Sequence, residues 1–141
     1  MAESNPRKIL SIDDEPDILT VYRSALSLQG YAIETASEPD EGIRMLREQG
    51  DFDLLMLDVK MPGKSGFDVY TEIREFIELP VLFVTAYPKS FTLESDQVTH
   101  MWQDQFADGT TDILYKPFEI DQLYDKIDGL IGSASGSGDD S

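Results

Sequence analysis

The stretch Phe52-Asp53-Leu54-Leu55-Met56-Leu57-Asp58, followed by Val59-Lys60-Met61-Pro62-Gly63-Lys64-Ser65-Gly66, decides the fold class. Its first half is almost continuously apolar, which is typical of a central strand that helices cover on both faces. The apolar run stops at Asp58, and the Pro and two Gly that follow indicate a tight loop. The sequence therefore predicts a buried strand over Phe52–Leu57 with an acidic residue at its carboxyl end.

The same pattern, an apolar run that stops at a polar residue, occurs three more times. The strands predicted in this way are Lys8–Asp13, Val81–Thr85 and Asp112–Tyr115, and they end at Asp13-Asp14, Thr85 and Lys116. A further strand is expected over Tyr31–Ala36. Amphipathic stretches separate the strands, which predicts repeated βα units and a parallel sheet. The carboxyl ends of such strands share one edge, where ligands bind.

Helical spacing of apolar residues predicts the elements between the strands. The first helix follows Pro16 and presents Ile18, Leu19, Tyr22, Ala25 and Leu26. Gly30 is expected to end it, and Ser37 is expected to cap the next helix. Later helices are predicted over Phe67–Phe76, Gln97–Phe106 and Glu119–Leu130.

Composition limits the class of protein. A chain of 141 residues, 40% of them hydrophobic, predicts one folded domain. It contains no cysteine, which excludes disulfides and thiolate chemistry. No apolar stretch approaches the roughly 20 residues that span a bilayer, and Met1–Lys8 is polar, so a cytoplasmic location is expected. The net charge of −17 argues against direct binding to nucleic acid or to anionic membranes.

Each polar strand end has an ordinary structural explanation when it is taken alone. Asp13 or Asp14 could cap a helix, Asp58 could cap a loop, and Thr is common in strands. Lys116 could reach water along its stem, although Pro117 hints at a constrained or cis peptide bond. An acid pair, an acid, a hydroxyl and a base at successive strand ends form a combination that would fit Mg²⁺ and a phosphoryl group.

The chain resembles the receiver domain of two-component response regulators. The resemblance covers about Lys8 to Ile131 and rests on four segments: Ile9-Leu10-Ser11-Ile12-Asp13-Asp14-Glu15-Pro16, Leu57-Asp58-Val59-Lys60-Met61-Pro62-Gly63, Val84-Thr85-Ala86 and Tyr115-Lys116-Pro117-Phe118. It implies a doubly wound, flavodoxin-like three-layer αβα sandwich with five parallel strands in the order 2-1-3-4-5 and five helices. We therefore expect a receiver domain over 8–132, after an N-terminal extension over 1–7.

The resemblance also implies roles for the polar strand ends. Asp58 would accept a phosphoryl group from a sensor histidine kinase or a histidine phosphotransfer protein. Asp14, Asp58 and the backbone carbonyl of Lys60 would bind Mg²⁺, and Asp13 would help through water. Lys116, the Thr85 hydroxyl and the Ala86 N–H would hold the phosphoryl oxygens. Such a protein is a switch rather than an enzyme in the usual sense, although the family can hydrolyse its own phosphoaspartate.

Two departures from the family pattern stand out. The position three residues before Lys116, which usually carries a ring that couples to the Thr, is Ile113, and Tyr115 does not occupy the same place. Tyr87 and Lys60 flank the site. The connection between Thr85 and Lys116 is longer than the family needs by about two to three helical turns, with the extra residues around 88–104.

Other interpretations remain. A haloacid dehalogenase-type phosphatase would need an acid at position 60, which is Lys, and a flavodoxin-like cofactor binder would need a phosphate loop after the first strand. A scaffold-only receiver is not favoured, because all five site residues are present. Ile18–Leu28 and Ile120–Ile131 could also serve a dimer face. The tail 133–141 contains only Gly, Ala, Ser and Asp and should be disordered, so we expect a stand-alone regulator that signals by protein contact without a DNA-binding domain.

Overall fold

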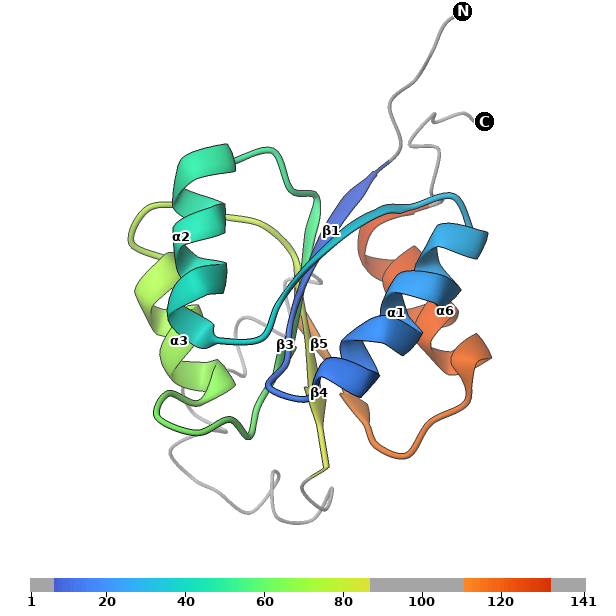
Figure 1. Ribbon diagram of the computed structural model, residues 1–141. Coiled ribbons are helices and arrows are strands. Elements are labelled where there is room, and N and C mark those ends of the chain that lie inside the picture. The colour runs from blue at the N-terminus through green and yellow to red at the C-terminus, as the bar shows by residue number, and fades with distance from the viewer. Residues whose placement is uncertain (1–6, 87–110, 133–141) are drawn as a thin grey trace, which may run out of the picture.

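A computed structural model of the chain describes residues 7–86 and 111–132. Within these ranges five parallel strands form one sheet in the order β2-β1-β3-β4-β5 (Figure 1), which confirms the predicted fold class and strand order. The strands are β1 (Lys8–Ile12), β2 (Ala32–Ala36), β3 (Leu54–Asp58), β4 (Val81–Thr85) and β5 (Thr111–Tyr115). The helices are α1 (Pro16–Leu28), α2 (Pro39–Gln49), α3 (Gly66–Ile73) and α6 (Ile120–Ile131).

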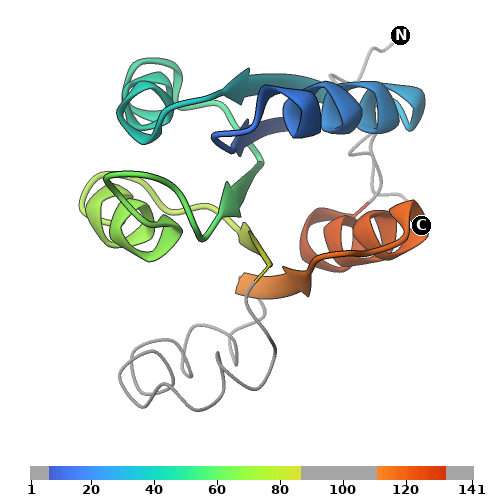
Figure 2. The ribbon, with the colours of Figure 1, turned by 60° about the horizontal axis from the view of Figure 1, so that its bottom comes forward.

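The helices form two layers, with α1 and α6 on one face of the sheet and α2 and α3 on the other (Figures 1 and 2). Every residue of β3 and β4 is buried, as expected for central strands with helices on both faces. Alternate β3 side chains enter different cores. Leu55 and Leu57 pack with the α2 and α3 layer, whereas Leu54 and Met56 pack with the α1 and α6 layer.

Helix ends follow the local sequence with two differences from the prediction. Gly30 follows the C-cap of α1 with a φ of 94°, in the left-handed region where glycine is favoured. Ser37 does not cap α2, because Pro39 occupies the first turn and places Glu38 at the N-cap. The third helix ends at Ile73 rather than Phe76, because the Phe76 N–H bonds to the carbonyl three residues back, as in a turn, at 3.0 Å.

The described ranges contain no helix that is both long and apolar enough to cross a membrane. The predicted helix over 97–106, the extended segment 88–104 and the tail 133–141 lie outside the described residues. The parallel register places the ends of β3, β4 and β5 together, since Asp58 pairs with Val84 and Thr85 pairs with Tyr115. The carboxyl edge is therefore well defined, and it carries the polar residues predicted from the sequence.

Candidate functional site

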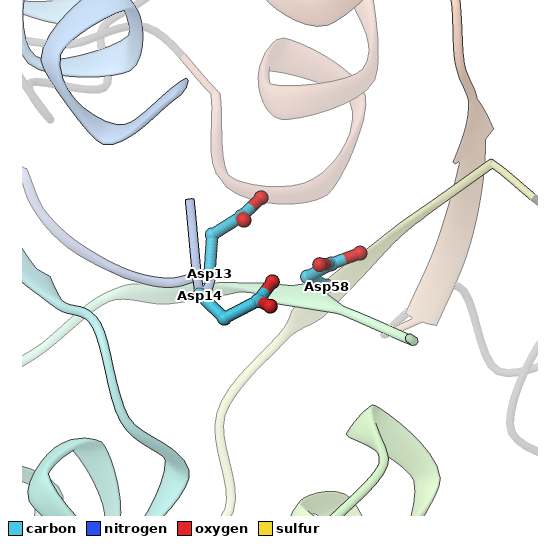
Figure 3. A group of neighbouring side chains, drawn as sticks. All are labelled: Asp13, Asp14 and Asp58. Atoms are coloured by element: carbon cyan, nitrogen blue, oxygen red, sulfur yellow. The ribbon is translucent and has the colours of Figure 1, made fainter. Parts of the chain in front are cut away.

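Three carboxylates meet at the carboxyl edge of the sheet, and we call Asp13, Asp14 and Asp58 the acidic cluster. Asp13 and Asp14 follow β1, and Asp58 is the last residue of the adjacent strand β3. One oxygen from each carboxylate can be chosen so that all three lie within 4.8 Å of one another. Figure 3 shows the Asp14 carboxylate directed toward Asp58. The structure thus brings together the three acids that the sequence placed at separate strand ends.

Burial makes this cluster electrostatically costly. Asp13 is 1% exposed and Asp58 is 6% exposed. Loss of water raises the pKa of Asp58 to about 7, with a further increase from the charge of Asp13 and a smaller opposing effect from Lys116. Burial also raises the pKa of Asp13, against the hydrogen bond that its Oδ1 accepts from the Glu15 N–H. The two buried acids therefore resist being charged together.

Lys116 is the cation that reaches the acidic cluster from β5. Its Nζ lies 3.5 Å from Asp13 Oδ2 and 3.9 Å from Asp58 Oδ1. The Lys116 backbone N–H donates to the Thr85 carbonyl at 2.8 Å, so the same residue ties β5 to the end of β4. The Lys116–Pro117 peptide bond is cis, in agreement with the hint from the sequence.

The donor set of the acidic cluster fits a divalent cation. The Lys116 ammonium alone cannot neutralise three carboxylates, and Asp13 Oδ2 is buried without a hydrogen bond from any residue in the described ranges. Carboxylate oxygens are the ligands that hard cations such as Mg²⁺ prefer. The arrangement can therefore hold a cation and, beside it, an anionic group that Lys116 would pair with.

Gly66 sets the approach of α3 to this edge, a role that the sequence pattern did not reveal. A Cβ on residue 66 would lie 2.5 Å from the Asp58 carbonyl oxygen, and the Gly66 N–H donates to the Val59 carbonyl at 2.8 Å. Ser65 and Asp68 form a capping box that starts the helix. The missed signal was a glycine directly after a capping serine, which allows the helix to begin against the backbone of β3.

Lys64, in the loop between β3 and α3, forms ion pairs with both helices on that face of the sheet, α2 and α3. Its Nζ lies 2.8 Å from Asp40 on α2 and 2.8 Å from Glu72 on α3. The two side-chain hydrogen bonds raise the pKa of Lys64. No sequence pattern indicated this bridge, because its acids are 24 residues before and 8 residues after the lysine. The loop that carries Lys60 is thus anchored at its far end.

The remaining predicted site residues fall into three groups. Thr85 is buried at the end of β4, and Ala86 and Lys60 are exposed beside the cluster. Ile113 pairs with Phe83 and packs in the α2 and α3 core, whereas Tyr115 is the register partner of Thr85. Side chains of register partners leave a parallel sheet on the same face, so Tyr115, not Ile113, lies next to Thr85. Tyr87 lies outside the described residues.

Comparisons with known proteins agree with this geometry. Residues 9–128 match the family described as the response regulator receiver domain. The transcriptional regulatory protein ResD of Bacillus subtilis (strain 168) is 34% identical over 135 residues, which cover 96% of this chain and 52% of ResD. The chain spans about half the length of the curated relatives it matches.

Solved structures show the same fold. A response regulator receiver domain protein from Clostridium thermocellum is 30% identical with a TM-score of 0.72, and the match covers 89% of this chain and 94% of that one. The response regulator TrrA of Thermotoga maritima, solved in complex with Mg²⁺ and BeF, is 29% identical with a TM-score of 0.68. That match covers 88% of this chain and 98% of TrrA.

Proposed function

Because the chain belongs to the family of response regulator receiver domains, we propose that Asp58 accepts a phosphoryl group in a Mg²⁺-dependent reaction. The observation that carries this proposal is the acidic cluster itself: two buried acids and a half-buried one within 4.8 Å of one another, beside Lys116. Receiver domains are signalling switches that interact with histidine kinases or phosphotransfer proteins. One of these partners would supply the phosphoryl group here.

The residues that would hold Mg²⁺ are Asp14, Asp58 and the backbone carbonyl of Lys60, with Asp13 acting through water. When bound, Mg²⁺ supplies positive charge that offsets the carboxylates and the charge on the phosphoryl oxygens. The presence of Mg²⁺ and BeF in the TrrA complex supports this assignment by similarity.

The chain's own residues perform the transfer by position and charge. An Asp58 carboxylate oxygen attacks phosphorus as the bond from phosphorus to the donor breaks, and the donor leaves with that electron pair. Asp58 must be ionised to attack, and with a pKa of about 7 it is only partly ionised at neutral pH, so a nearby cation would increase the reactive fraction. Lys116 pairs with one phosphoryl oxygen, while the Thr85 hydroxyl and the Ala86 N–H donate to the others.

The next question is how the phosphorylated protein passes on its signal. Phosphorylation adds charge of about −1.5 to −2 beside Thr85, and we propose that the protein then signals by contact with another protein and can hydrolyse its own phosphoaspartate. The relative ResD is named a transcriptional regulatory protein, and this chain covers 52% of it. Signalling without a DNA-binding domain therefore stays a prediction. A cytoplasmic location and a dimer face are predictions as well.

Intact mass spectrometry after incubation with acetyl phosphate tests the proposal. We expect wild type to gain the mass of one phosphoryl group with Mg²⁺ and nothing with a chelator, and Asp58→Asn to gain nothing. Asp17→Asn, on the exposed first turn of α1, is the matched control and should behave as wild type. Absence of the gain in wild type at every Mg²⁺ concentration would favour the scaffold interpretation, and a gain retained by Asp58→Asn would place the acceptor elsewhere.

A further inference from the structure

Lys116 has to reach acids that belong to a distant part of the sheet. Asp13 follows β1, and Lys116 follows β5, with β3 and β4 between these two strands. The sheet therefore does not hold the two residues side by side. Their ion pair at 3.5 Å depends on how the segment after β5 sits against the segment after β1.

An aromatic stack joins those two segments directly. Tyr22 lies on α1, the helix that follows Asp13 and Asp14, and Phe118 comes two residues after Lys116. Their ring centroids are 6.5 Å apart with an interplanar angle of 13°, a stacked arrangement. Stacked rings at this separation lie within the range of favourable aromatic pairs. Tyr22 is buried, and both rings pack in the core between α1, α6 and the sheet.

Two contacts hold the chain on either side of Lys116, and the stack is one of them. On one side, the Lys116 N–H donates to the Thr85 carbonyl at 2.8 Å. On the other side, beyond Pro117, the Phe118 ring stacks on the Tyr22 ring. A second contact, from the Tyr124 hydroxyl to the Ala25 carbonyl at 2.8 Å, keeps α6 against α1 farther from the cluster. The position of Lys116 therefore depends on the stack more directly than on the packing of α6.

Tyr22 also lies close enough to the acidic cluster to sense its charge. Burial raises the pKa of the Tyr22 hydroxyl, and the charges of Asp13, Asp58 and Glu15 raise it further. The Tyr22 hydroxyl thus lies within electrostatic range of the acids that Lys116 pairs with. A smaller side chain at position 22 would leave Phe118 without its stacking partner and free the turn that carries Lys116.

We propose that Tyr22 is a positioning residue, whose ring, stacked on Phe118, holds the Lys116 ammonium over Asp13 and Asp58. This inference rests on the proposed function, in which Lys116 pairs with the phosphoryl group. The ring rather than the hydroxyl carries the effect. Tyr22→Phe should therefore keep the phosphorylation rate within about twofold, whereas Tyr22→Leu should lower it about tenfold, since small displacements of aligned groups are costly.

The test is a double-mutant cycle between Tyr22→Leu and Lys116→Ala, with the rate of phosphorylation by acetyl phosphate as one readout. If Tyr22 acts through Lys116, Tyr22→Leu will slow the wild-type protein but will not slow Lys116→Ala further. Tyr31→Leu is the matched control, because Tyr31 is a buried tyrosine of the same core at the opposite edge, where its hydroxyl bonds to the Gly132 carbonyl. It should lower stability without changing the rate.

A second readout, the dissociation constant for Mg²⁺ measured by calorimetry, does not require phosphorylation. Displacing an ammonium from the cluster removes its repulsion of the cation, so Tyr22→Leu should tighten Mg²⁺ binding about twofold to threefold. The Lys116→Ala background should show no such change. If wild type takes no phosphoryl group, the proposed function fails, while this calorimetric cycle still decides the role of Tyr22.

Two results would overturn the inference. One is a folded Tyr22→Leu variant with the rate and Mg²⁺ affinity of wild type. The other is an effect of Tyr22→Leu that multiplies with that of Lys116→Ala in both readouts. If Tyr22→Leu does not fold, Phe118→Leu replaces it in the cycle, because Phe118 is only partly buried and its replacement removes the same stack from the other side.

Discussion

The two edges of the sheet carry lysines with the same exposure but different surroundings. At the amino edge, Lys8 is 21% exposed and lies 3.1 Å from both Glu34 and Asp51, whose side chains are 38% and 65% exposed. At the carboxyl edge, Lys116 is also 21% exposed, but its partners Asp13 and Asp58 are almost fully buried and lie farther from it. At the amino edge Lys8 forms two ion pairs with acids that remain in contact with water. At the carboxyl edge the buried acids carry more negative charge than Lys116 can offset.

This difference shows what marks the candidate site. Both edges offer a lysine and acids, so a count of ion pairs does not tell them apart. Water stabilises the acids of the amino edge, but at the carboxyl edge its loss raises the pKa of Asp13 and Asp58. Burial of the acids therefore leaves a demand for positive charge, which a bound divalent cation would satisfy.

The largest effect is expected from removing each lysine in turn. Lys116→Ala should slow phosphorylation by acetyl phosphate on the order of 10²-fold, as the loss of one charge-stabilising group does in other transfer sites. Lys8→Ala should leave the rate unchanged, because it lies at the opposite edge. Rates from intact mass at saturating Mg²⁺ measure both. Equal slowing by the two substitutions would mean that the comparison between the edges is wrong.

The pH dependence of stability should also separate the edges. The pKa of Asp58 is raised from its ordinary 3.8 to about 7, so the native protein keeps a proton that the unfolded chain releases. Stability without Mg²⁺ should therefore fall as the pH rises from about 4 to 7. Asp58→Asn removes this cost and should be more stable than wild type by up to about 4 kcal/mol at pH 8, with little difference near pH 4.

Urea unfolding at both pH values, with a chelator present, measures this gain. Asp51→Asn is the control at the amino edge, where the carboxylate is solvated. A gain from Asp58→Asn that is the same at pH 4 and pH 8 would contradict the assigned burial cost.

A smaller effect is expected from the backbone that supports the carboxyl edge. Gly66→Ala should cost about 1–3 kcal/mol, because the added Cβ meets backbone atoms of Asp58 and Val59 that cannot move easily. Gly129→Ala, in α6 with nothing within 4 Å of the added Cβ, should instead stabilise by about 0.5–1 kcal/mol. Thermal unfolding compares them, and a neutral Gly66→Ala would show that the approach of α3 is loose.

The smallest expected effect is the change in stability when Lys8, at the amino edge, is replaced. Lys8→Met should cost at most about 1 kcal/mol, because exposed ion pairs contribute little. The loss should shrink further at high salt, since ions screen the attraction to Glu34 and Asp51. Urea unfolding at low and high salt measures both. A cost of several kcal/mol, unaffected by salt, would mean that the amino edge is buried in the same sense as the carboxyl edge.

Sequence patterns predicted the features that depend on periodicity and failed where distant segments meet. Apolar runs marked the strand ends, so the sequence alone predicted Asp13, Asp58 and Lys116 at one edge of the sheet. The burial of Tyr22 followed from helical spacing. The stack of Tyr22 with Phe118 could not be predicted, because spacing along one helix does not show which loop from another strand packs against that helix.

Three other features depended on tertiary structure in the same way. Gly66 was expected only as a turn glycine, and its contact with the Asp58 carbonyl appears when α3 is placed against β3. Lys64 was part of a loop pattern, and its acids on α2 and α3 come near only after folding. Ile113 departs from the family's ring position, and only strand register shows that Tyr115 lies opposite Thr85.

A calorimetric titration with Mg²⁺ tests the central claim most directly, namely that the buried acids of the carboxyl edge form a cation-dependent site. We predict one ion per chain for wild type and for Asp51→Asn, and no binding for Asp58→Asn. Binding should release protons at pH 6.5 and fewer at pH 8.5, because the cation ionises an acid whose pKa is about 7. Binding that is unchanged in Asp58→Asn, or lost in Asp51→Asn, would contradict the account.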